Sequence, residues 1–86
     1  MTNPIDINAV TRASLLRMGQ TWYRQGKFNQ AEDTYFRIMQ EHPDTKEAEG
    51  AQRELVAMAA AFEAEGLFHL AIDILDRLGQ AAVESV

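Results

Sequence analysis

The stretch LLRMGQTWYRQGKFNQAEDTYFRIMQEHP, residues 15–43, decides the fold of this 86-residue chain. Its first half places apolar or small side chains three and four residues apart, the spacing of one helix face. Gly26 interrupts this pattern, a second amphipathic run follows, and Pro43 ends that run. The two faces carry Leu15, Met18, Gly19 and Trp22, and then Phe28, Ala31, Tyr35 and Ile38. Because Gly19 and Ala31 are small, we expect two helices folded back on each other in close contact there.

Capping signals extend this reading to four helices. Asn3 or Asp6 can cap a first helix that reaches about Gln25, and Asp44 or Thr45 can cap the third. We expect the second helix to run from about residues 27–29 to 41, the third over about 45–65, and the fourth over about 68–78 or beyond Gly79. The expected core positions of the last two are Leu55, Met58, Ala59 and Phe62, and then Phe68, Ala71, Ile72, Leu75 and Leu78. No strand-like alternation competes, so the predicted fold is all-α.

The pattern of residues 15–35 returns forty residues later. The shift aligns Leu15 with Leu55, Met18 with Met58, Gly19 with Ala59, Trp22 with Phe62, Gly26 with Gly66, Phe28 with Phe68, Ala31 with Ala71 and Tyr35 with Leu75. Each pair keeps the residue or its physical type. On these positions the chain resembles the tetratricopeptide repeat (TPR) family, whose repeat ends with a proline at the place of Pro43. Val83 stands at that place in the second unit.

The resemblance implies four antiparallel helices that form two stacked TPR-like helix-turn-helix hairpins within a single domain, residues 1–86. Repeat 1 would cover about residues 7–43 and repeat 2 about 45–83. The interval is longer than the 34 residues of the family, and the extra residues near 46–51 predict a lengthened start of the third helix. Stacked repeats usually number three or more, whereas two are present here.

Composition excludes several classes of function. The net charge of −5 argues against general nucleic-acid binding, which requires neutralisation of phosphates. The chain has no cysteine, its first residues do not resemble a secretory signal, and no apolar run approaches the length of a membrane span. We therefore expect a cytoplasmic protein without membrane insertion.

The charge is spread unevenly along the chain. Residues 1–40 carry five basic and three acidic side chains, whereas residues 41–86 carry three basic and ten acidic side chains. This uneven charge indicates either ordinary solvated helix faces or a polarised surface. A polarised surface could orient a partner or dock copies of the protein head to tail.

The TPR resemblance implies that a partner binds in a concave groove lined by the first helix of each hairpin. The groove candidates are Ala13, Leu16, Gln20, Tyr23 and Arg24, and then Val56, Ala60, Glu63 and Ala64. They lack the Lys, Asn and Arg set with which one TPR subset clamps a terminal carboxylate. The middle of the groove is apolar, which favours an apolar or amphipathic helical segment of a partner protein. Alternatively, Leu16 and Val56 pack against each other between helices.

A second candidate surface lies on the fourth helix, where Leu67, Leu70 and Ile74 are spaced three and four residues apart. Polar Lys27, Gln30 and Thr34 stand at the equivalent places in the first unit. Such a stripe predicts either a homodimer surface or a face covered by the tail, residues 81–86. The main functional prediction is a protein-binding adaptor, and the alternative is a self-associating structural protein. Within the binding class, residues 41–55 are also similar to the lengthened repeats of bacterial envelope-assembly proteins.

Catalytic and metal-binding patterns are weak. His69 and Asp73 lie four residues apart on one helix, which is far more typical of an exposed hydrogen-bonded pair than of a metal site. Ser14 and Ser85 have no histidine near them in sequence, and the glycines do not form a phosphate-binding loop. We expect no enzymatic activity, no metal and no cofactor.

Overall fold

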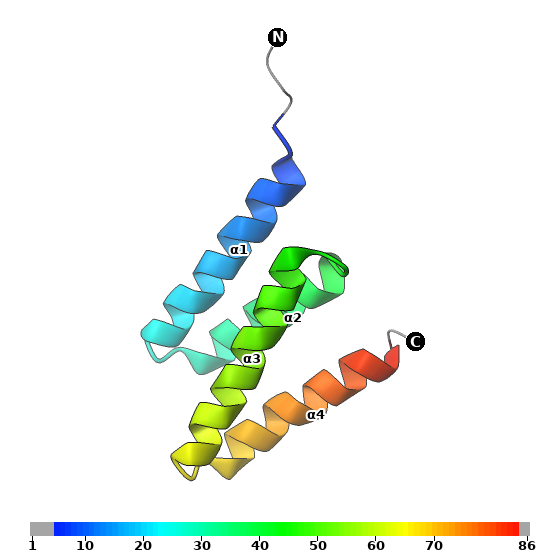
Figure 1. Ribbon diagram of the computed structural model, residues 1–86. Helices are drawn as coiled ribbons and strands as arrows, with labels where there is room; N and C mark the ends of the chain where they lie inside the picture. Colours follow the sequence, from blue (N-terminus) through cyan, green and yellow to red (C-terminus); the bar gives the residue numbers. More distant parts are fainter. Residues whose placement is uncertain (1–4, 85–86) are drawn as a thin grey trace. The chain divides into compact units, whose positions relative to one another are not determined.

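The computed structural model describes residues 5–84, and these form four α-helices with no strand. The helices are α1 (Ile7–Arg24), α2 (Phe28–Glu41), α3 (Lys46–Ala64) and α4 (Phe68–Glu84). In Figure 1, α1 and α2 form one antiparallel hairpin, and a second tight turn joins α3 to α4. This arrangement confirms the predicted all-α fold with helix-turn-helix hairpins. Gly79 lies inside α4, and residues 81–84 continue that helix instead of folding back over it.

The two hairpin turns are built in the same way. After α1, the Lys27 N–H donates to the carbonyl of Trp22 at 2.9 Å, and the Gly26 N–H donates to that of Tyr23 at 3.0 Å. After α3, Leu67 and Gly66 repeat these bonds at 2.8 and 3.0 Å. Both glycines adopt a left-handed backbone, with φ of 75° and 79°, which a side chain would strain. The forty-residue repeat therefore extends to the hydrogen bonds of the turn.

Side-chain caps begin α1 and α3. The Asp6 carboxylate accepts a hydrogen bond from the Ala9 N–H at 3.1 Å, which selects Asp6 over the alternative Asn3, a residue outside the described part of the chain. Thr45 Oγ1 accepts from the Ala48 N–H at 3.1 Å and donates to the His42 carbonyl at 2.7 Å. Thr45 is thus the cap of α3.

The structure divides into two compact units, residues 1–51 and 52–86, with the boundary inside α3. In the first unit the buried apolar side chains come from α1, α2 and the first turns of α3: Leu15, Ala31, Tyr35, Phe36, Ile38, Ala48 and Ala51. Helices α1 and α2 approach closely at Gly19, because a Cβ placed there would lie 2.5 Å from Cε1 of Tyr35. The predicted close contact at Gly19 is confirmed, with the Tyr35 ring as the neighbour.

The second unit buries Leu55, Met58, Ala59, Phe62, Ala71 and Ile74. The predicted core stripe of α3 is confirmed in full. On α4 the prediction is confirmed for Ala71 and wrong for Phe68, Ile72 and Leu75, which are exposed, and Leu78 is half-buried. None of the described helices is long and apolar enough to cross a membrane.

Candidate functional site

The α1 part of the predicted groove is a set of half-buried side chains. Leu16, Gln20 and Tyr23 are partly exposed along one face of α1, as is Ala13, and Arg24 is exposed. The Tyr23 ring lies against the ring of Phe28 at the start of α2, with centroids 5.5 Å apart and planes tilted by 53°. This contact restrains the Tyr23 side chain while one part of it stays accessible.

The α3 part of the predicted groove is exposed. Val56, Ala60, Glu63 and Ala64 all lie on the accessible side of α3, and Val56 is the large apolar member. These residues belong to the second compact unit, whereas those of α1 belong to the first. Each helix therefore offers its own partly apolar face of accessible side chains.

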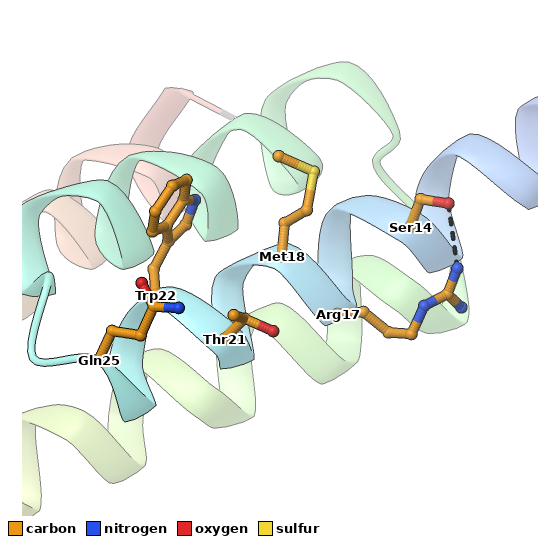
Figure 2. Close-up of a pocket in the computed structure, with 6 residues that line it drawn as sticks. All are labelled: Ser14, Arg17, Met18, Thr21, Trp22 and Gln25. Carbon is orange, nitrogen blue, oxygen red and sulfur yellow. Dashed lines mark hydrogen bonds between the residues drawn. The ribbon is translucent and has the colours of Figure 1, made fainter.

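An open hollow of about 420 Å³ lies on another face of α1. Its lining is Ser14, Arg17, Met18, Thr21, Trp22 and Gln25. Figure 2 shows Met18 and Trp22 projecting from neighbouring turns of the helix, with the Arg17 guanidinium turned toward Ser14. The Arg17 to Ser14 Oγ hydrogen bond is 3.1 Å long. The size is that of a small-molecule or side-chain pocket, although the hollow is open to solvent.

Sequence reasoning missed this hollow. It assigned Met18 and Trp22 to the core, but Met18 is 47% exposed and Trp22 is half-buried. The Lys27 ammonium lies 5.2 Å from the centroid of the Trp22 ring, so a cation covers part of that ring. The sequence did contain a signal in the further apolar residues Ile7 and Val10 of α1, and both are also exposed. The apolar arc of α1 is therefore wider than the part of α1 that α2 covers.

The predicted oligomer surface on α4 needs correction. Ile74 is completely buried and Leu70 is half-buried, which leaves Leu67 as the exposed member of the predicted set. The apolar face that α4 does expose consists of Phe68, Ile72 and Leu75, with exposures of 59%, 53% and 49%. These residues are spaced four and three apart and form one stripe. Both the predicted set and the exposed stripe have the three- and four-residue spacing of a helix face. Contacts with other helices therefore decide which of the two is buried.

One ion pair ties α1 to the first turn of α3. Arg12 Nε donates to Glu47 Oε1 at 2.7 Å, and both side chains are largely buried. The hydrogen bond from Arg12 and its positive charge hold the pKa of Glu47 below its ordinary value, against the opposing effect of burial. This pair links α1 to the start of α3.

The described residues contain no group of three or more His, Asp or Glu side chains placed to hold a metal ion. The accessible features of these residues include apolar helix faces bordered by charge, of the kind that contacts other polypeptides.

Comparison with known protein families places a similarity on the first hairpin. The tetratricopeptide-repeat family model matches residues 13–45, which span most of α1, all of α2 and the turn before α3. No curated protein and no solved structure matches the chain. Tetratricopeptide repeats are in general protein-interaction modules and typically not enzymes. The first hairpin is therefore similar to a tetratricopeptide repeat over residues 13–45.

Proposed function

We propose that this protein is an adaptor that binds an apolar or amphipathic helical segment of a partner protein through the accessible faces of α1 and α3. The proposal includes a cytoplasmic location, no catalytic role and no nucleic-acid ligand. The observation that carries it is the character of these faces in a TPR-type hairpin: accessible apolar side chains flanked by charged ones.

The α1 face has the features of a preformed binding surface. Leu16 is partly exposed, and the Tyr23 ring is restrained by Phe28, so little side-chain entropy is lost when a partner covers them. On α3, exposed Val56 and Ala60 offer shallow apolar contacts, and Glu63 adds a negative charge at one end. An amphipathic helix matches such a face with apolar residues three and four apart.

The homodimer predicted through Leu67, Leu70 and Ile74 is not retained as a second function. A buried Ile74 cannot contribute to an interface without unfolding of α4, and half-buried Leu70 contributes little area.

The experiment places a photoreactive amino acid at Val56 and, as a control, at Gln40, which is exposed on α2. Crosslinked partner segments recovered from host cells at position 56 but not at position 40 are then synthesised as peptides and titrated against the purified protein. We expect helical content to rise on binding, as measured by circular dichroism.

Val56→Glu tests the face directly, because the side chain is 49% exposed, and an unchanged melting temperature checks that the variant folds. We expect affinity for the peptide to fall at least about tenfold, the loss that is typical of an important interface contact. Gln40→Glu adds the same charge on α2 and should leave affinity unchanged. Equal affinities for wild type and Val56→Glu would refute the proposed function.

A further inference from the structure

Equivalent positions of the two repeats differ sharply in exposure on α1 and α3. Met18 is 47% exposed, whereas Met58, its equivalent forty residues later, is 2% exposed. Trp22 is half-buried, and its equivalent Phe62 is 2% exposed. A face that is covered on α3 is therefore open on α1, where it forms the hollow.

The second helices show the reverse difference. Ile72 and Leu75 are exposed on α4, but the equivalent residues of α2, Glu32 and Tyr35, are buried. Phe68 also is more exposed than Phe28, its equivalent. Repeat proteins cover such faces with a neighbouring repeat, and a terminal repeat normally presents a polar face instead. Here an apolar face of a first helix and an apolar face of a second helix are both open.

We propose that these two faces bind each other between copies of the chain, so that α4 of one copy docks head to tail on the α1 hollow of the next. The interface joins Phe68, Ile72 and Leu75 of one copy to Met18 and Trp22 of its neighbour.

Charge selects this pairing over a symmetric one. Helix α1 carries three arginines, of which Arg12 is paired with Glu47, and no acidic residue, whereas α4 carries three acidic residues and one arginine. Arg17 lines the hollow, and Asp73 and Asp76 are exposed beside the α4 stripe. Two α1 faces or two α4 faces would bring like charges together, and α1 against α4 brings opposite charges together. The occupant that fits best is a second copy.

The shapes of the two faces support the same pairing. Phe68 is the most exposed member of the α4 stripe, and the hollow beside Trp22 has room for an aromatic side chain. Gly79 lies one helical turn beyond Leu75, and a Cβ there would meet no atom within 4 Å. Glycine inside a helix is unfavourable, so its presence on the open stripe is consistent with close approach of another helix.

Because the two faces differ, each bound copy keeps one face open. Such a heterologous contact produces open chains or closed rings instead of isolated dimers. Association is expected to rise with protein concentration and to weaken with salt, since exposed charges contribute. The faces are separate from the proposed groove, so failure of either proposal leaves the other standing.

The test uses two variants of the full chain, Met18→Glu and Ile72→Glu, which block α1 and α4 respectively. Both side chains are exposed, so both variants should fold, and melting temperatures check this. We expect wild type to associate in sedimentation velocity, each variant alone to be monomeric, and an equimolar mixture to form a 1:1 complex that grows no further. Gln40→Glu is the matched control and should associate as wild type does.

Trp22 gives an independent readout, since it is the one tryptophan of the chain. Its emission should shift to the blue and become protected from iodide quenching as wild type, but not Met18→Glu, is concentrated. The proposal is overturned if wild type is monomeric up to about 1 mM, the weak end of specific association. It is also overturned if either variant alone associates like wild type, because that indicates a symmetric contact, or if the mixture stays monomeric.

Discussion

Replacing Gly19 by alanine tests the close contact at the centre of the first hairpin. The new Cβ would lie 2.5, 2.8 and 2.9 Å from three carbons of the Tyr35 ring, whereas carbon atoms in contact prefer about 3.5–4.0 Å. The ring or the helices must therefore move by about 1 Å, and the fully buried Tyr35 has no space to move into. Overpacking of this kind costs about 1–3 kcal/mol.

Alanine also has a higher helix propensity than glycine, by about 0.5–1 kcal/mol, which offsets part of this cost. The net destabilisation expected for Gly19→Ala is about 0.5–2 kcal/mol, and each kcal/mol lowers the melting temperature of a small domain by about 4–8 °C. Gly79→Ala is the matched control, since its Cβ meets open space. Thermal unfolding followed by circular dichroism should show Gly19→Ala below wild type and Gly79→Ala above it.

A smaller side chain opposite Gly19 should relieve the contact. Tyr35 is fully buried and its ring is the closest neighbour of a Cβ at Gly19, so shortening it makes room for the alanine. In a double-mutant cycle, Tyr35→Leu should reduce the cost of Gly19→Ala, with a coupling of about 0.5–3 kcal/mol. A Gly19→Ala variant as stable as Gly79→Ala, or a double variant with strictly additive costs, would refute this reasoning.

Three further predictions concern the ends of helices. Thr45→Ala removes the cap of α3 and should cost about 1 kcal/mol in chemical unfolding, whereas Thr45→Ser keeps the hydroxyl and should cost less. Gly66→Ala places a side chain at φ 79° and should cost about 1–2 kcal/mol; a neutral result would mean that the turn relaxes. Arg12 lowers the pKa of Glu47 in the folded state, so this ion pair stabilises the fold fully above the ordinary value of 4.5 and progressively less as pH falls through the lowered pKa. The gap in melting temperature between wild type and Glu47→Gln should therefore be widest near neutral pH and shrink in acid; a constant gap would contradict the linkage.

Local signals made much of the fold predictable from the sequence. Gly26 and Gly66 end helices because a left-handed residue is needed there, and Asp6 and Thr45 begin helices because their side chains accept backbone N–H groups. Each of these features depends on neighbours within a few residues. Because equivalent residues recur in the second hairpin, the same prediction applied to both hairpins.

The surfaces were harder to predict, because burial depends on distant neighbours. Helix α4 is apolar around most of its circumference, so spacing alone did not show that Ile74 is buried and that Phe68 and Ile72 are exposed. The same holds for α1, where Met18 and Trp22 continue the stripe of Leu15 but lie at its open edge. Spacing identifies a helix and its apolar residues, and it leaves open which part of a wide apolar arc another helix covers.

The most direct test of the proposed function is a map of backbone amide chemical shifts, recorded while the protein is titrated with the partner peptide identified by crosslinking. Our account predicts that the largest shifts fall on α1 at Leu16, Gln20 and Tyr23 and on α3 at Val56 and Ala60, and that Val56→Glu suppresses them. Shifts confined to the hollow around Met18 and Trp22, or to the exposed stripe of α4, would contradict it.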